Sequence, residues 1–166
     1  TGVDQADYLV AGTLQADAGK SKDYQLTATI TERRTGLVIA RAVSRVKAEE
    51  IDATPTAFFA DSPSLVNDRL TEGQIRTSQA AVGTQADQAY LASISTGAVI
   101  NEADQAYDAQ QWPKALQRYQ IAVQRSDGQQ LRVFNGLYNT QLKLGNQRDA
   151  EAAFGQIVAL GLGTNN

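Results

Sequence analysis

The chain has no cysteine, no methionine and no histidine. Without thiol and imidazole groups it cannot form disulfides, the zinc, haem or iron–sulfur sites that need those ligands, or a nucleophile activated by histidine. We therefore expect no cofactor and no metal, and any chemistry would have to come from carboxylate, lysine, tyrosine or serine groups. Because the chain starts at Thr1 without an initiating methionine, we also expect it to be processed or cut from a longer protein.

Excess positive charge and long hydrophobic runs are absent as well. Fifteen lysine and arginine residues stand against eighteen aspartate and glutamate residues, for a net charge of −3 in 166 residues. Proteins that bind nucleic acid by neutralising phosphates usually carry the opposite sign, so we expect protein partners and no nucleic acid. Apolar stretches such as Leu37–Ala40 fall far short of the roughly 20 residues that span a bilayer, so we expect no membrane span in this fragment.

Residues 1–52 are predicted to form a three-stranded antiparallel meander. Along Tyr24–Thr31 apolar and polar residues alternate, which is the period of a strand that buries one face. The apolar set on this strand is Tyr24, Leu26, Ala28 and Ile30. Gly36 is suited to a left-handed turn position before the β-branched run Leu37–Val46, and Tyr8–Leu14 supplies the remaining strand. Three strands enclose no core alone, so we expect downstream helices or an N-terminal segment to cover this sheet.

Residues 53–85 lose this period and are predicted to be an ordered connector. The adjacent Phe58 and Phe59 indicate that it is pinned to a surface, because two exposed phenylalanines would promote aggregation. We expect at least one of them to be buried.

From Thr84 onward the apolar period becomes helical. The spacing of Thr84 and Asp87 is that of a capping box, and Pro113 suits the first turn of a helix. Helices are predicted at residues 86–110, 113–125, 129–144 and 147–160. The pattern leaves open whether the first of them is interrupted at Ser95–Gly97.

The helical region contains an internal repeat. Ala115 and Ala150 lie 35 residues apart, close to the period of about 34 in tetratricopeptide repeats, and each is followed four residues later by an aromatic residue, Tyr119 or Phe154. Residues 100–161 resemble this family, although Tyr138 stands where the family usually has glycine. The sequence thus predicts an α+β fold, in which the meander is followed by a helical domain, residues 86–161, of two tetratricopeptide-like hairpins.

The β region carries a resemblance of its own. The pattern of Ala6–Leu14, Tyr24–Thr31 and Arg34–Ala40 resembles that of bacterial envelope lipoproteins related to the curli-secretion-channel subunit and the penicillin-binding-protein activator. With the helical repeat behind it, the chain is similar to the N-terminal part of large periplasmic proteins that end in an outer-membrane-protein-A-like, peptidoglycan-binding domain. This resemblance implies a periplasmic location, outer-membrane association through a missing lipidated N-terminus, and contact with cell-wall components through a missing C-terminal domain.

The resemblance to tetratricopeptide repeats also implies a peptide-binding surface on the first helix of each hairpin. One polar stripe beside the buried face of the third predicted helix contains Arg132, Asn135, Asn139 and Lys143. The matching stripe on the preceding hairpin contains Asn101, Gln105 and Asp108. The asparagines would hydrogen-bond a peptide backbone, while Arg132 and Lys143 would attract a carboxylate. The alternative is that these residues form an ordinary solvated surface, and two repeats alone would bind weakly.

Other polar groups favour structural interpretations. Trp112 is expected to pack between helices and not to bind a ligand. Glu49, Glu50 and Asp52 are expected to solubilise a strand end, because calcium loops need a spaced set of ligands. The basic residues around Arg33 and Arg34 are expected to form a charged sheet surface, with binding to anionic lipid or wall polymer as the alternative.

These patterns favour a non-enzymatic periplasmic scaffold or adaptor that mediates protein–protein interaction in an outer-membrane or cell-wall assembly. The alternative is a structural subunit of an oligomeric secretion or envelope channel that assembles through the β region. A third class, a carboxylate-based hydrolase of wall glycan, would require a pair of acids in a cleft.

Overall fold

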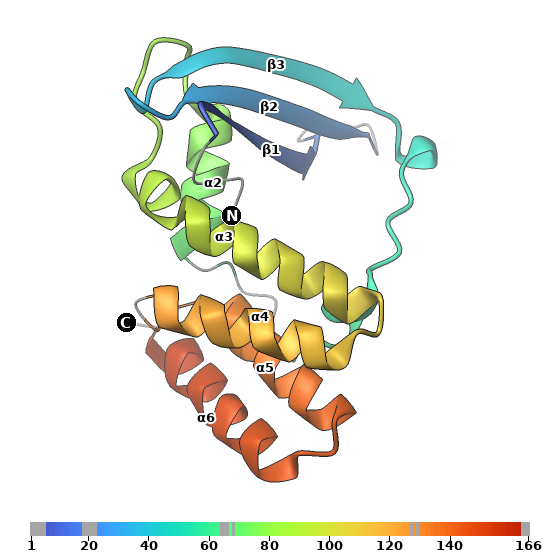
Figure 1. Cartoon of the computed structure of the whole chain (residues 1–166). Coiled ribbons are helices and arrows are strands. Elements are labelled where there is room, and N and C mark those ends of the chain that lie inside the picture. The colour runs from blue at the N-terminus through green and yellow to red at the C-terminus, as the bar shows by residue number, and fades with distance from the viewer. Residues whose placement is uncertain are drawn as a thin grey trace. The chain divides into compact units, whose positions relative to one another are not determined.

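The computed structural model describes residues 6–17, 23–63, 67, 69–126, 128 and 130–163. The strands are β1 (Tyr8–Ala16), β2 (Tyr24–Glu32) and β3 (Val38–Val46), and the helices are η2 (Ala48–Glu50, a 3-10 turn), α1 (Ala57–Asp61), α2 (Arg69–Gln79), α3 (Gln88–Asp108), α4 (Trp112–Arg125), α5 (Leu131–Lys143) and α6 (Gln147–Gly163) (Figure 1). The predicted α+β class is confirmed. Among the described residues, none of the helices combines the length and the apolarity needed to cross a bilayer.

The chain forms two compact units. The sheet unit contains Thr1–Thr54 and Leu70–Ile94, and the helical unit contains Pro55–Arg69 and Ser95–Asn166. Helix α3 therefore contributes its first turns to the sheet unit and the rest to the helical unit. Residues 53–85, predicted as a connector, contain α1 and α2, two helices that the sequence analysis did not predict.

The sheet has the predicted meander order β1-β2-β3, with antiparallel pairing throughout. Tyr8 lies opposite Glu32 across the first pair of strands. Gly36 has the predicted left-handed conformation, with φ at +71°, in the turn between β2 and β3. The register shifts by one residue opposite Ile30 and Thr31, where Ile39 forms a bulge in β3.

The sheet buries the face opposite to the one that the alternation in β2 predicts. Thr27, Thr29 and Thr31 are 4%, 0% and 0% exposed, whereas Leu26 and Ile30 are 41% and 37% exposed. The hydroxyl of Thr29 donates a 3.4 Å hydrogen bond to the carbonyl of Ala11. The expectation that the apolar set of β2 faces the core was therefore wrong.

Helix α2 and the first turns of α3 cover the threonine face of the sheet (Figure 1). The core between them contains Leu9, Ala11, Val38, Ala86 and Tyr90. Of the two covers that the sequence leaves open, it is therefore downstream helices that cover this face. Polar contacts add to the packing, because the hydroxyls of Thr13 and Ser78 lie 2.9 Å apart and Arg41 donates a 3.4 Å hydrogen bond to the carbonyl of Ser78.

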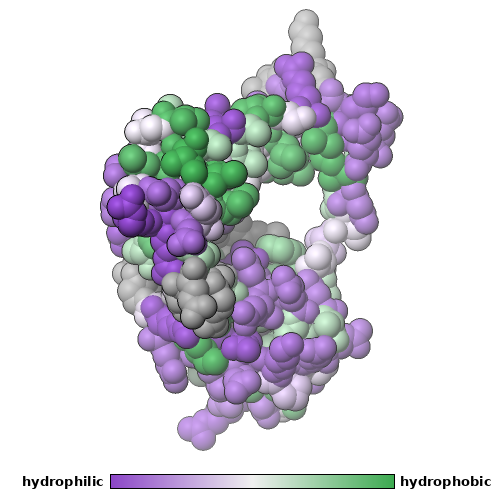
Figure 2. Space-filling model, turned by 45° about the horizontal axis from the view of Figure 1, so that its top comes forward, coloured by the Kyte–Doolittle hydropathy of each residue, from purple (hydrophilic) through white to green (hydrophobic). Residues whose placement is uncertain are grey.

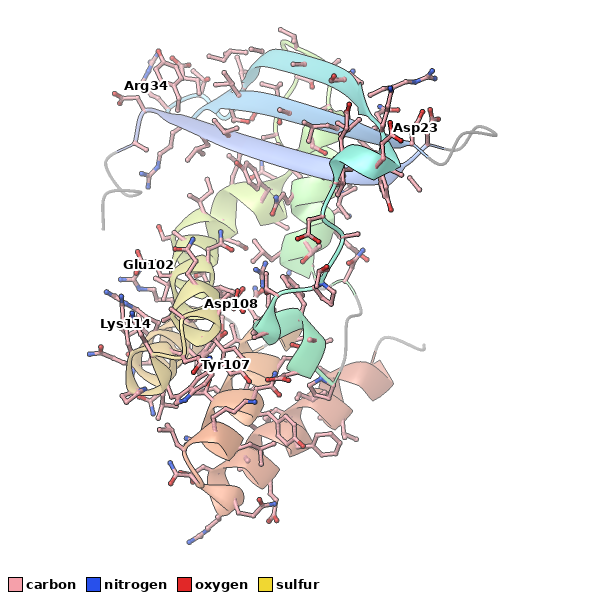
Figure 3. The ribbon with its side chains drawn as sticks, turned by 90° about the vertical axis from the view of Figure 1, so that its right-hand side faces the viewer. Asp23, Arg34, Glu102, Tyr107, Asp108 and Lys114 are labelled. Atoms are coloured by element: carbon pink, nitrogen blue, oxygen red, sulfur yellow. The ribbon has the colours of Figure 1, made fainter. Side chains whose placement is uncertain are left out.

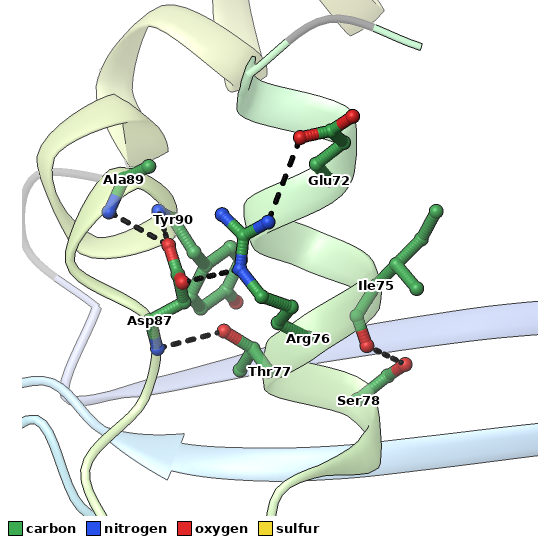
Figure 4. A network of polar contacts seen from close by, with 8 residues as sticks. All are labelled: Glu72, Ile75, Arg76, Thr77, Ser78, Asp87, Ala89 and Tyr90. Atoms are coloured by element: carbon green, nitrogen blue, oxygen red, sulfur yellow. Dashed lines mark hydrogen bonds and ion pairs between the residues drawn. The ribbon is translucent and has the colours of Figure 1, made fainter.

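Asp87 joins α2 to the start of α3 (Figure 4). Its Oδ1 accepts hydrogen bonds from the backbone N–H groups of Ala89 at 2.8 Å and Tyr90 at 3.4 Å, so Asp87 is the N-cap of α3. Its Oδ2 accepts a 2.7 Å hydrogen bond from Nε of Arg76. The predicted capping role of Thr84 is wrong, since its hydroxyl donates instead to the carbonyl of Ala81 at 2.6 Å. The Arg76 hydrogen bond, followed by those of the capped backbone, holds the pKa of Asp87 below its usual range.

In the helical unit, α4 packs against α5 and α5 packs against α6. Helix α3 runs through Ser95–Gly97 without interruption, and Pro113 lies in the first turn of α4 as predicted. The ring of Tyr119 on α4 packs so closely against Gly136 on α5 that an added Cβ atom at Gly136 would overlap it. Glycine at this position is therefore a packing requirement between the two helices.

Candidate peptide-binding site

The surface predicted to bind peptide carries α1, a five-residue helix of the same chain. Phe58 of α1 is 1% exposed, with its ring centroid 6.1 Å from that of Tyr107 and 6.2 Å from that of Tyr119. Phe59, in contrast, is 40% exposed. The prediction that at least one of the two phenylalanines is buried is confirmed.

Asp108 on α3 holds the backbone of α1. Its Oδ1 accepts a 2.8 Å hydrogen bond from the N–H group of Phe58, in the first turn of α1. Figure 3 shows Tyr107 and Asp108 beside α1, whereas Glu102 and Lys114 lie on the other side of α3 and α4. One of the predicted site residues thus contacts a peptide backbone, and the peptide belongs to the chain itself.

The carboxylate of Asp61 at the end of α1 is bound by two side chains. The hydroxyl of Tyr107 donates a 2.6 Å hydrogen bond to Oδ2, and Nζ of Lys143 lies 3.0 Å from the same oxygen. The hydrogen bonds from Tyr107 and then Lys143 hold the pKa of Asp61 below its usual range. Lys143, which the sequence predicts to attract a carboxylate, therefore lies against one.

Arg132 on α5 lies between a buried acid and the aromatic side chains of α1. It forms an ion pair with Asp104 on α3, in which Nε donates a 2.7 Å hydrogen bond to Oδ2. Its guanidinium carbon lies 5.8 Å from the ring centroid of Phe58 and 5.3 Å from that of Phe59. Both distances fall within the range of cation–π attraction. Because Arg132 bonds Asp104, its guanidinium is fixed in place where α1 packs.

Asp104 supports this arrangement from inside the helical unit. It is 5% exposed, and the hydroxyl of Tyr119 donates a 2.7 Å hydrogen bond to its Oδ1. Burial raises the pKa of Asp104, against the opposing effects of Arg132 and Tyr119. Burial, the nearby Asp104 charge and the hydrogen bond also raise the pKa of Tyr119 well above its usual range, so its hydroxyl stays a donor.

Asp104 was not predicted as a site residue, although the sequence holds a signal for it. It lies on α3 four residues after Ile100 and three before Tyr107, which are both fully buried. An acid at that spacing shares the apolar face of the helix, and a buried acid needs a partner. The partner, Arg132, is 28 residues further along the chain, so the spacing indicates the buried acid without identifying its counter-ion.

The other four predicted residues are Asn101, Gln105, Asn135 and Asn139. Asn135 and Asn139 are each 3% exposed and lie within the helical unit. Asn101 is exposed on α3. Gln105 lines a separate groove of about 460 Å³ formed by α3 and the start of α4. The contacts with α1 that support the predicted site are therefore those of Asp108, Arg132 and Lys143.

Other surfaces of the described chain are less specific. A groove of about 620 Å³ runs between α4, α5 and α6, with Val123, Phe134 and Leu137 in its lining and glutamine side chains around them. Within the ranges that the structure describes, no group of three or more acidic side chains is placed to hold a metal ion. Glu49 and Glu50 lie exposed on η2.

In comparisons with protein-family models, with curated protein sequences and with solved structures, no match to this chain was found.

Proposed function

We propose that this protein is a non-enzymatic adaptor whose helical unit binds short peptide segments that carry an aromatic residue and, three residues later, a carboxylate. The observation that supports this function is the binding of Phe58 and Asp61 of α1 by residues of α3, α4 and α5. In this proposal α1 occupies the site in the same way as a partner segment would.

Each part of α1 meets a group that can recognise the same part of another peptide. The aromatic ring of Phe58 contacts Tyr107 and Tyr119. The backbone N–H of Phe58 donates a hydrogen bond to Asp108. The carboxylate three residues later meets the Tyr107 hydroxyl and Lys143. A short segment with an aromatic anchor and a fixed carboxylate is a recurring mode of peptide recognition.

The tethered α1 would act as a resident competitor. A segment held on the same chain has an effective concentration that reaches the millimolar range for short flexible linkers. The apparent affinity for a partner segment equals the affinity of the empty site multiplied by the fraction of molecules in which α1 has left it, so a small open fraction weakens binding. A natural partner must therefore make contacts beyond those of α1, for example with Phe59, which is 40% exposed beside the site.

We place this adaptor in the periplasm, in an outer-membrane or cell-wall assembly. The support is the resemblance of the strand pattern over Ala6–Ala40 to envelope lipoproteins. Fractionation of cells that produce the natural full-length protein tests this location, and recovery in the cytosolic fraction would contradict it.

Peptide selection tests the binding specificity without assuming a partner. The Phe58→Ser variant, in which α1 loses its buried anchor, is immobilised and presented with a random peptide library. We expect enrichment of sequences with an aromatic residue three positions before an acidic one. Lys143→Glu in the same background is the matched control, and it should remove the preference for the acid while the aromatic preference remains. No enrichment, or enrichment that Lys143→Glu leaves unchanged, would contradict the proposal.

A further inference from the structure

The outer sheet face, which is the face opposite α2 and the first turns of α3, is apolar and exposed. By the strand registers it consists of Tyr8, Val10, Gly12, Leu14, Ala16, Tyr24, Leu26, Ala28, Ile30, Glu32, Ala40, Ala42, Ser44 and Val46. Val10 is 73% exposed, Leu14 46% and Leu26 41%. Figure 2 shows hydrophobic surface gathered over the strands. A contiguous apolar surface of this kind marks an interaction site in a soluble protein.

The outer sheet face carries one charged side chain among its described residues, that of Glu32, which lies at the end of β2 opposite Tyr8. Its Oε2 accepts a 2.6 Å hydrogen bond from the hydroxyl of Thr35, and its Oε1 lies 3.9 Å from the guanidinium of Arg34, so this charge is paired at the rim of the face. Arg41 and Arg45 of β3 lie opposite Thr29 and Gln25 of β2, and they therefore belong to the other face of the sheet. A surface that is apolar apart from one paired charge at its rim favours an equally apolar partner, and a copy of itself meets that condition. We propose that two copies of this chain associate through the outer sheet face.

The relief of the outer sheet face is self-complementary. The middle row across the strands consists of the small residues Gly12, Ala28 and Ala42. The rows on either side of it contain the larger pairs Val10 with Ile30 and Leu14 with Leu26. Rows on one face are about 7 Å apart along the strands, so a shift by one row seats a large row of one copy over the small row of the other. Two-fold symmetry makes this placement reciprocal.

The free edge of β1 is a less favourable route to a second copy. In an antiparallel pair, every second residue of a strand directs its backbone N–H and C=O groups toward the partner strand. Asp7 and Asp17 are bonded toward the β2 side, so the even-numbered residues between them direct these groups to the free edge. The carbonyl of Gly12 therefore points to the free edge, where it accepts a 3.2 Å hydrogen bond from Nε2 of Gln74. Pairing along the edge would have to displace Gln74, whereas association through the outer sheet face displaces no described side chain.

The size of the outer sheet face indicates a reversible dimer. Strands of nine residues at about 3.4 Å per residue, spaced about 4.8 Å apart, give a face of about 400 Å². A standard interface takes about 800 Å² from each partner. An interface of about half that size belongs to the weak, transient class, so we expect the dimer to form only toward the upper end of the micromolar-to-millimolar range.

Sedimentation velocity over a range from micromolar to millimolar concentration tests this proposal. Val10→Lys places a charge on the outer sheet face, and Val82→Lys is the matched control, because Val82 is 58% exposed in the loop between α2 and α3. We expect the wild-type chain and Val82→Lys to dimerise equally and Val10→Lys to weaken the dimer at least about tenfold, since each copy would bury an unpaired charge. Leu26→Lys on the central strand is a second variant, and circular dichroism shows that each variant is folded.

Two results would overturn the proposal. One is a wild-type chain that stays monomeric at every concentration. This result would overturn the proposal even if the outer sheet face were found to bind a different protein. The other is a dimer that persists unchanged in folded Val10→Lys and Leu26→Lys, because such a dimer would use another surface.

Discussion

The hydroxyl of Tyr107 donates a 2.6 Å hydrogen bond to Oδ2 of Asp61, across 46 positions of sequence. This bond joins α3 to α1, and Lys143 of α5 lies 3.0 Å from the same carboxylate oxygen. Three segments that are distant in sequence therefore meet at one carboxylate. A competing segment would have to offer a carboxylate at this point and an aromatic ring where Phe58 lies.

Phe58→Ala is expected to lower the free energy of unfolding of the helical unit by about 3 kcal/mol, as for a buried phenylalanine truncated to alanine. Phe59→Ala is the matched control, and it should cost less than about 1 kcal/mol because Phe59 is 40% exposed. Trp112 is the single tryptophan and lies in the helical unit, so its fluorescence during urea unfolding reports both effects. Equal destabilisation by the two variants would contradict the packing described for α1.

Gly136→Ala is expected to destabilise the helical unit by about 1–3 kcal/mol, because the added Cβ atom would overlap the Tyr119 ring. Gly155→Ala in α6 is the control, since a Cβ there meets no described atom within reach. That variant should gain about 0.5–1 kcal/mol from helix propensity. Thermal unfolding of the two variants should therefore shift in opposite directions, and a shift in the same direction would argue against the close contact of α4 and α5.

Asp87→Ala is expected to cost about 1 kcal/mol at neutral pH through loss of the N-cap of α3. The pH dependence follows from the lowered pKa of Asp87. A carboxylate with a lowered pKa in the folded state contributes stability above its unfolded pKa of about 3.9 and loses it as the pH falls toward the folded pKa. Stability curves of the wild type and Asp87→Ala should accordingly converge below that pH. A constant difference down to pH 2 would contradict a charged Asp87.

Arg132→Met is expected to cost about 3 kcal/mol at pH 7, because it leaves the buried carboxylate of Asp104 without its counter-ion. The pKa of Asp104 is already raised by burial and should rise further. Because the pKa of Asp104 is raised in the folded state, the protonated carboxyl contributes its full stability to the protein at low pH. This contribution is lost as the pH rises through the pKa of Asp104 in the folded state. The variant should therefore approach the wild type in stability on acidification from pH 7 toward pH 4, as measured by urea unfolding.

Asp104→Asn added to Arg132→Met is the control for this prediction. Removal of the buried charge should recover part of the loss and flatten the pH dependence. If Arg132→Met were destabilised equally at all pH values, the loss would arise from packing of the arginine side chain and not from the unpaired carboxylate.

The sequence predicts the strands well and their burial poorly, and β1 shows why. Leu9 and Val10 point to opposite faces of the sheet, and both are apolar. Alternation therefore locates the strand without showing which face the helices cover. Threonine can be buried in β2 because its side chain has an apolar methyl group and a hydroxyl that can form a hydrogen bond with the backbone, as the hydroxyl of Thr29 does.

Helices α1 and α2 escape prediction because their stability comes from distant contacts. Helix α1 has five residues, too few for a periodic pattern, and it is held by Asp108 and Lys143 from other segments. Helix α2 contains Gly73, which allows the close approach of Ala89 and Tyr90 and lowers helix propensity. Local sequence reasoning cannot supply partners that lie tens of residues away.

The measurement that tests the binding site most directly is a titration with a synthetic peptide that corresponds to residues 55–62. The account predicts saturable binding to the Phe58→Ser variant, with an increase in its unfolding temperature, and much weaker binding to the wild type, in which α1 occupies the site. Peptides that carry Phe58→Ala or Asp61→Asn should bind more weakly than the parent peptide. A folded Phe58→Ser variant that does not bind the peptide, or that binds a scrambled peptide equally well, would contradict the account.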